Sequence, residues 1–407
     1  MTSAPPSRCR SCGADSVGTV LDLGPQPVAD DLFDDPDQAR AAPRHRLALG
    51  SCADCGLVQL DPATPLLANA AHGHGSAFSG TVLQHERDWA EELLSLPSLH
   101  GGGRVLDVGS GTGGLLQFFA HAGLTVQGWE RDPALADQAT VAGLPTAPVD
   151  GAVGGRDDGQ FDLVLANHTL SHADDLDTAV GTLARSLAPG GTLAVEFHSA
   201  LGILTGGQFD VVCHAHRSYL SLTALQAALG RHGLSVTHAR SLPLHGGVVR
   251  LRARSAATAG QDDGGVRDLL ATEGAVGVTS SEAWAAVTDR AARVRTQLRA
   301  VLVEQLAAGR TVGGYGAPSR GTTLLNSCGI DAGQVPRTAD RSPAKQGRFL
   351  PGAGTAVCSP EQLAALRPDV LVVLVWPLRA EVLTQLDDLR RAGTRFLFPL
   401  PELELVQ

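Results

Sequence analysis

The chain has 407 residues, with 32 basic and 42 acidic side chains and a formal net charge of -10. At about 150 residues per domain, this length suggests two or three domains. The acidic balance argues against a nucleic-acid-binding protein, which usually shows a basic footprint. No apolar run approaches the roughly 20 residues of a membrane-spanning helix, and the N-terminus lacks an apolar secretory stretch. We therefore expect a cytoplasmic protein with no membrane or nucleic-acid partner.

Four of the seven cysteines form two Cys-x-x-Cys pairs that are separated by 39 residues. Two such pairs can direct four thiolates at one tetrahedral zinc ion, and a closed four-cysteine site is structural because it leaves no open position for substrate. Redox-active thiols and chance are the alternatives. Short apolar runs broken by Gly, Pro and Asp surround the pairs, so we predict a small zinc-binding domain of strands and loops at residues 1–68. The predicted zinc ligands are Cys9, Cys12, Cys52 and Cys55.

The rest of the chain alternates helical and strand-like apolar patterns. A helical pattern from Thr81 to about Leu96 precedes a strand at 105–108, and further alternation predicts a doubly wound α/β domain at residues 69–261. A Gly-rich segment near 253–280 is typical of a loop or linker. A long helix from about Glu282 to Gly309 then leads into a second, Rossmann-like α/β domain at residues 262–407.

The strand at 105–108 runs directly into the glycine loop Gly109-Ser110-Gly111-Thr112-Gly113. Glycines let a backbone approach a ligand at the carboxyl end of a strand. Asp107 within the strand and Glu130 at the end of the next strand favour S-adenosylmethionine (SAM) over NAD, with Glu130 accepting hydrogen bonds from the ribose. A structural glycine turn is the remaining alternative. The predicted cofactor-binding residues are Asp107, Gly109, Ser110, Gly111, Glu130, Arg131, Asn167 and His168.

Histidines gather after the predicted strands. His168 and His172 follow the fourth strand, His198 follows the fifth, and His214 and His216 flank Ala215 in the stretch FDVVCHAHRSY. Histidine is suited to proton transfer near neutral pH, so we expect catalysis here. A second metal site at the His-x-His motif and purely structural histidines are the alternatives.

Together these motifs resemble the sugar C-methyltransferases of deoxysugar biosynthesis, and the resemblance runs nearly from end to end. It includes the four cysteines, the SAM motif, and the stretch FDVVCHAHRSYLSL, which is close to the family pattern FDxxYHEHxSYFS. It also includes His245-Gly246-Gly247, the loop Gly314–Gly321, Asp340 and Lys345-Gln346-Gly347.

The resemblance implies a SAM-dependent enzyme that methylates a carbon of a 4-keto deoxysugar linked to a nucleotide, usually thymidine diphosphate. A base would remove the acidic hydrogen beside the ketone, and the enolate carbon would take the methyl group. His216 matches the catalytic histidine of the family, His214 would orient the keto group, and His172 and His245 match other histidines near the sugar. The implied substrate-binding residues are Tyr219, Tyr315, Gly316, Ala317, Ser319, Arg320, Asn326 and Lys345. A monomer or homodimer is expected.

The chain departs from the family pattern at the expected acid/base site. Cys213 and Ala215 stand where the family has Tyr and Glu, and His72 and His74 lie in a region that usually carries tyrosines. Sugar C-methylation with His74 or His72 replacing the lost groups is one interpretation. Carbon, nitrogen or oxygen methylation of another acceptor, methylation combined with ketoreduction, and a binding protein without catalysis are the others. A nicotinamide oxidoreductase with two α/β halves is the rival class of enzyme.

Overall fold

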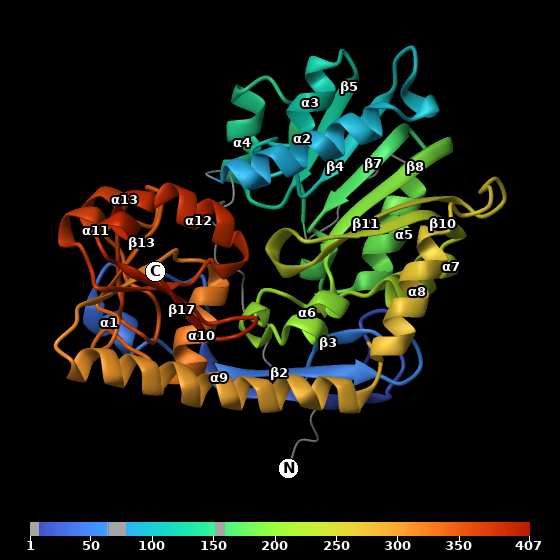
Figure 1. Ribbon diagram of the computed structural model, residues 1–407. Helices are drawn as coiled ribbons and strands as arrows, with labels where there is room; N and C mark the ends of the chain where they lie inside the picture. Colours follow the sequence, from blue (N-terminus) through green and yellow to red (C-terminus); the bar gives the residue numbers. More distant parts are fainter. Residues whose placement is uncertain (1–7, 63, 65–78, 151–158) are drawn as a thin grey trace.

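The computed structural model describes residues 8–62, 64, 79–150 and 159–407, and it contains three β-sheets. Each sheet has its own helices, and the three units pack against one another (Figure 1). Among the described helices, none combines the length and the apolar character needed to cross a membrane.

The first sheet holds the two cysteine pairs and has the strand order β1-β2-β3-β9. All of its pairings are antiparallel. Its last strand comes from far along the chain, because Val58 of β3 pairs with Tyr219. Asp35 is the N-cap of the short helix α1, and its side chain accepts hydrogen bonds from the first turn. The elements are β1 (Val17–Pro27), α1 (Pro36–Arg40), β2 (Arg44–Cys52), β3 (Val58–Leu60) and β9 (Ser218–Tyr219).

The central sheet has seven strands in the order β10-β11-β8-β7-β4-β5-β6. The neighbouring strands β8, β7, β4, β5 and β6 run parallel to one another. Strands β11 and β10 extend this sheet at one edge with antiparallel pairings. This is the doubly wound arrangement predicted from the alternating pattern. Its strands are β4 (Arg104–Val108), β5 (Thr125–Glu130), β6 (Thr146–Pro148), β7 (Phe161–Asn167), β8 (Leu187–His198), β10 (Leu234–Leu242) and β11 (Val248–Ser255). Its helices are α2 (Gly80–Leu94), α3 (Leu116–His121), α4 (Pro133–Val141), α5 (Leu176–Ser186), α6 (Ala200–Gly206) and α7 (Leu222–Arg231).

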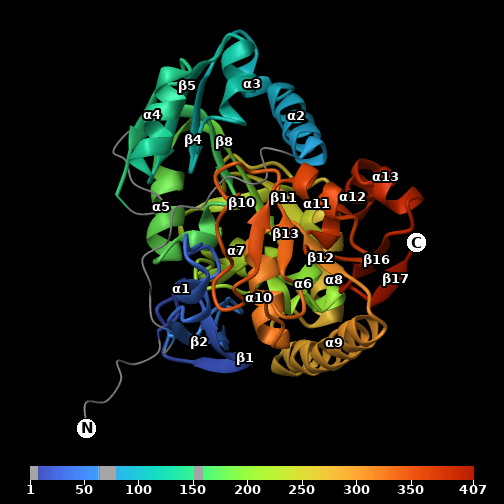
Figure 2. The ribbon, with the colours of Figure 1, turned by 90° about the vertical axis from the view of Figure 1, so that its left-hand side faces the viewer.

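The third sheet has the order β14-β13-β12-β15-β16-β17, with only β17 antiparallel. Its strands are β12 (Val312–Tyr315), β13 (Arg337–Ala339), β14 (Ala356–Cys358), β15 (Val370–Val373), β16 (Arg395–Phe398) and β17 (Glu404–Val406). Its helices are α9 (Ser281–Ala307), α10 (Ser319–Cys328), α11 (Pro360–Leu366), α12 (Arg379–Gln385) and α13 (Asp387–Arg391). Figures 1 and 2 show the long helix α9 running beneath this sheet and alongside β1 of the first.

The segment near 253–280, expected to be a linker, contains the helix α8 (Gly265–Val276), so that prediction was wrong. Glycines at both ends of α8 made the segment look irregular, but Val266 and Leu269 are buried. Glu273 is fully buried and accepts hydrogen bonds from the backbone N–H groups of Leu222 and Thr223, at 2.7 and 2.8 Å. A glutamate thus caps α7 from a neighbouring helix, a contact that no local pattern reveals.

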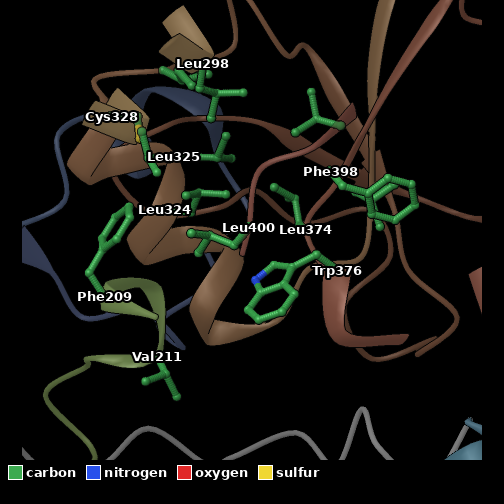
Figure 3. Close-up of a cluster of buried hydrophobic side chains, with 14 of the residues drawn as sticks. Phe209, Val211, Leu298, Leu324, Leu325, Cys328, Leu374, Trp376, Phe398 and Leu400 are labelled. Carbon is green, nitrogen blue, oxygen red and sulfur yellow. The ribbon is translucent and has the colours of Figure 1, made fainter. Parts of the chain in front are cut away.

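The largest apolar cluster joins the first and third sheets through the short helical turn η4 (Phe209–Val211). Figure 3 shows Phe209 and Val211 of this turn beside Leu324 and Leu325 of α10. Trp376 packs in the same cluster, and its Nε1 donates to the Asp210 carboxylate at 2.8 Å. The first and third sheets are therefore joined beside the segment that carries the histidines.

Candidate functional site

The four cysteine Sγ atoms all lie within 4.8 Å of one another. The pairs Cys9–Cys55 and Cys12–Cys52 are 3.5 and 3.6 Å apart. Four ligands at about 2.3 Å from a tetrahedral zinc ion would be about 3.8 Å apart, so the cluster fits zinc. Contact with Cys9 raises the pKa of Cys55, and contact with Cys55 lowers the pKa of Cys9 to about 5. A zinc ion would bind all four sulfur atoms as thiolates.

The glycine loop follows β4 as predicted, and the backbone N–H groups of Gly109 and Ser110 donate to Trp129 O on the neighbouring strand. Gly109 has φ +74°, and a Cβ there would collide with the hydroxyl of Thr169. That hydroxyl donates to Val108 O at 2.6 Å. The loop therefore requires glycine both for its backbone conformation and for its packing against the end of β7.

The residues around this loop fit SAM. Glu130 accepts hydrogen bonds from the N–H groups of Gly111 and Asp132 at 2.8 and 2.9 Å, which fixes its carboxylate beside the loop. Asp107 is 3 % exposed, and burial, with help from nearby carboxylates, raises its pKa to about 8. Three buried polar atoms near the loop have no hydrogen-bond partner among the described residues: Asp107 Oδ1, Ser110 Oγ and Asn167 Oδ1. Buried polar atoms normally have partners, so these unsatisfied atoms indicate a polar ligand. Arg131 is exposed at the rim.

Glu196 on β8 organises a cluster that the sequence analysis missed. Its carboxylate is 1 % exposed, lies 2.6 Å from His85 Nε2 and 3.1 Å from His168 Nε2, and pairs with Arg250. These hydrogen bonds and the Arg250 charge outweigh burial and hold the pKa of Glu196 well below its usual value. His168 has φ +57°, an uncommon conformation for a residue with a side chain. In the sequence, the only indication of this cluster was a glutamate within a strongly apolar strand pattern, two residues before His198. The partners of Glu196 come from three distant parts of the chain, so they could not be predicted.

His172 and His216 lie together, with ring centroids 5.1 Å apart. His172 Nδ1 is 3.0 Å from the carbonyl oxygen of Ala215. A carbonyl oxygen only accepts, so Nδ1 of His172 carries a proton. His214 faces another direction: it is 2 % exposed and packs edge-on to His45 of the first sheet, at 6.1 Å between centroids. Burial lowers the pKa of His214.

The two departures from the family pattern pack against the first sheet. Cys213 and Ala215 form a small buried cluster with Ala29. The Tyr219 hydroxyl accepts a hydrogen bond from Cys213 N–H at 3.1 Å and lies 3.3 Å from Cys213 O. The Tyr219 hydroxyl thus closes the loop that carries His216, and its ring lies 6.1 Å from the His216 ring.

His245 and Arg320 face the same region from the other side. His245 has φ +53°, and its ring centroid lies 6.2 Å from that of His168. Burial, followed by the charges of His168 and Arg320, lowers the pKa of His245 to about 3. Arg320 stacks on the Trp376 ring at 5.0 Å and lies 3.7 Å from the Asp210 carboxylate. Burial and the Arg320 charge also lower the pKa of His198 well below its usual value.

The predicted loop of the third sheet makes mostly internal contacts. Ala317 N–H donates to Asp340 and Ala317 O accepts from Lys345 Nζ, at 2.8 and 2.9 Å. Gly316 has φ +92°, where a side chain would be strained. The remaining side chains have partners outside the loop: Tyr315 with Gln385, Ser319 with Asp30, and Asn326 with Arg44, Thr322 and Pro351. His72 and His74 lie outside the described residues.

Three sequence families match successive parts of the chain: a zinc-binding domain over residues 9–66, a methyltransferase domain over 82–239 and a C-methyltransferase C-terminal domain over 243–401. The C-methyltransferase NovU of Streptomyces niveus is 31% identical over 408 residues, which cover 99% of this chain and 97% of NovU.

More distant matches cover the central unit. A malonyl-acyl-carrier-protein O-methyltransferase of Enterobacter lignolyticus is 29% identical over 198 residues, covering 45% of this chain and 76% of the relative. A SAM-dependent methyltransferase structure from Mesorhizobium loti covers 42% of this chain and 99% of its own, at 18% identity and a TM-score of 0.36. The full-length match decides the assignment: the chain belongs to the C-methyltransferase family that includes NovU, and it is a SAM-dependent methyltransferase with a structural zinc site.

Proposed function

We propose that this enzyme methylates a carbon beside the keto group of a nucleotide-linked 4-keto deoxysugar, most simply a thymidine diphosphate sugar. The observation that carries the proposal is the adjacent pair His172 and His216, 5.1 Å apart between ring centroids. Both rings belong to segments that follow the carboxyl end of β7 or precede β9, where a doubly wound fold binds its ligands.

His216 is proposed as the base. The C–H bond beside the ketone breaks, its proton passes to an imidazole nitrogen, and the bonding electrons form the enolate. Bound SAM supplies an electrophilic methyl group on a sulfonium. The enolate carbon forms a bond to that methyl carbon as the carbon–sulfur bond breaks, which leaves S-adenosylhomocysteine. The chain has to align base, sugar carbon and methyl, because such alignment supplies much of the rate.

The surroundings of His216 support this role without the carboxylate of the family pattern. His172 is anchored through Nδ1–H to Ala215 O at 3.0 Å, so its ring is held in a fixed orientation beside His216. The Tyr219 hydroxyl closes the same loop. These contacts restrict His216. The family's Tyr and Glu could hydrogen-bond to a sugar, whereas Ala215 has no polar side-chain atom and the buried Cys213 thiol is only a weak donor. A contact of His214 with the keto oxygen remains a prediction.

The nucleotide end of the substrate is proposed to lie toward the third sheet. Arg320 there is a fixed cation, stacked on Trp376 and next to Asp210. Lys345 adds a second charge, and Gly316 allows a tight backbone turn at positive φ. A diphosphate carries negative charge that such groups bind.

The test is a mass-spectrometric assay in deuterated water with SAM and a panel of thymidine diphosphate 4-keto deoxysugars. Methyl gain on the sugar with release of S-adenosylhomocysteine is expected. His216→Ala is expected to lower both methyl transfer and deuterium exchange by at least about 100-fold, with SAM binding unchanged. His100→Ala is the matched control, because it removes an exposed histidine that lies shortly before β4 of the central sheet.

Each result decides between the interpretations. Deuterium exchange that persists in His216→Ala would place the base elsewhere. Exchange in the wild type without methyl gain on any sugar would show a working base and the wrong acceptor. No exchange and no methyl gain across the panel would contradict the proposed sugar substrate and favour a different acceptor.

A further inference from the structure

The helix α2 directs a carboxylate toward the glycine loop. Its buried residues Val82, Trp89, Ala90 and Leu93 define one inward face. Glu86 falls on that face by helical periodicity and is only partly exposed. Its Oε2 lies 3.6 Å from the position that a Cβ on Gly114 would occupy, directly after the loop.

The Glu86 carboxylate is unusual because the described part of the chain offers it no hydrogen bond or ion pair. The helix neighbours on either side do have partners: His85 binds Glu196, and Arg87 stacks on Phe118. An inward-facing carboxylate without a partner costs free energy, so its presence on the buried face calls for a ligand.

A second, independent observation comes from Asp107. This side chain is 3 % exposed, and its Oδ1 has no partner among the described residues. Three carboxyl groups border the same glycine loop: Asp107 lies two residues before Gly109, Glu130 accepts from Gly111 N–H at 2.8 Å, and Glu86 lies beside Gly114. The charges of Glu86 and Glu130 add to burial in raising the pKa of Asp107. The three carboxyl groups come from α2, β4 and β5. Like charges brought together in this way are stabilised by a cation between them.

We infer that Glu86 is a specificity-determining residue of the cofactor site, where Glu86 and Asp107 together accept hydrogen bonds from the protonated α-amino group of the methionine part of SAM. This inference rests on the proposed placement of SAM at the glycine loop. An ammonium group has three N–H donors and satisfies both carboxyl groups. A sulfonium has no donor and would leave them unsatisfied. Glu130 already accepts hydrogen bonds from the N–H groups of Gly111 and Asp132, and in this proposal its remaining acceptor positions bind the ribose hydroxyls.

Calorimetric binding of three ligands tests the inference. SAM and S-adenosylhomocysteine both carry the ammonium group, whereas 5′-methylthioadenosine lacks the amino-acid part. Glu86→Gln is expected to weaken the first two ligands by an equal factor of about 10–100 and to leave the third unchanged. Glu91→Gln removes the same charge from an exposed position of the same helix and is expected to change nothing.

A purely structural role of Glu86 is separated by thermal unfolding of the ligand-free protein. Burial and the charge of Glu196 raise the pKa of Glu86, and the opposing effects of His168 and His85 are smaller, so Glu86→Gln is expected to raise the melting temperature. A lower melting temperature with all three ligands weakened alike would overturn the inference, as would loss of SAM affinity alone.

Glu130→Ala separates this inference from the placement on which it rests. Weaker binding of all three ligands in Glu130→Ala, with Glu86→Gln unchanged, would reject the role of Glu86 and keep the cofactor at the loop. Unchanged binding in both variants would reject the placement and the inference together.

Discussion

Arg250 and Glu196 form an ion pair in which each side chain is 1 % exposed. The Arg250 guanidinium also stacks on Trp89 at 4.5 Å and donates to His85 O at 2.7 Å. The pair therefore fastens α2 to β8 and β11. Removing Arg250 would leave the buried Glu196 carboxylate without its permanent cation and with only the two histidines, His85 and His168, as partners.

Arg250→Met is expected to lower the free energy of unfolding by about 3–5 kcal/mol, because breaking a buried pair costs more than the pair itself contributes. Urea denaturation measures the change. The double variant Arg250→Met/Glu196→Gln is the control and should recover part of the loss, since the stranded charge is gone. A loss below about 1 kcal/mol in the single variant would show that Glu196 finds another partner or water.

The zinc site gives a prediction that metal analysis can check. Purified protein should contain one zinc ion per chain, and Cys52→Ser should lose the metal and unfold the first sheet. Cys358→Ser removes a thiol from β14, outside the four-cysteine cluster, and should keep the zinc. Elemental analysis and limited proteolysis provide the measurements; a well-folded chain with no metal would contradict the assignment.

Asp107 predicts a pH dependence of stability. Its folded pKa is about 8, against about 3.9 for an unfolded aspartate. Between these values the folded chain holds a proton that the unfolded chain has released, so stability falls as pH rises, by up to about 1.4 kcal/mol per pH unit.

The Asp107→Asn variant isolates this effect because asparagine does not titrate. Between about pH 6 and about pH 8, the ligand-free wild type should lose about 2–3 kcal/mol more than the variant. Urea denaturation at both pH values measures the difference. Parallel pH profiles for the two proteins would show that Asp107 stays ionised in the folded chain.

Glu130 carries the remaining prediction about the cofactor. Glu130→Ala is expected to weaken SAM binding by about 1–3 kcal/mol, because it removes acceptors for the ribose hydroxyls. Asp137→Ala, on the neighbouring helix α4, is the control for loss of an acidic side chain. Calorimetry that finds equal affinity for the Glu130 variant and the wild type would place the ribose elsewhere.

The structural predictions that were confirmed depended on patterns within short stretches of the sequence. The cysteine pairs, the strand-to-glycine turn at Val108–Gly109 and the long helix α9 are each encoded within a short stretch, so spacing and periodicity predict them. The cluster around Glu196 could not be predicted in this way. His85 and Arg250 lie 111 and 54 residues from Glu196, and only the strand order of the sheet brings them together.

The candidate site shows the same limit. Sequence reasoning placed His214 and His216 in one motif, but a turn of the chain directs His214 to His45 and places His216 next to His172. It also treated Asn326 and Ser319 as ligands of the substrate, whereas their side chains reach Arg44 and Asp30 of the first sheet. Their predicted roles remain to be tested.

The pairing of Ser218–Tyr219 with β3 has a consequence for how such enzymes can be recombined. The edge strand of the zinc-bearing sheet comes shortly after the motif His214-Ala215-His216. The N-terminal sheet is therefore completed by residues that lie about 150 positions beyond residue 68 in the sequence. A chimaera that exchanges residues 1–68 between two family members inherits a mismatched edge strand beside His216. Exchanging residues 209–221 together with that module keeps the sheet and the acid/base segment from the same parent.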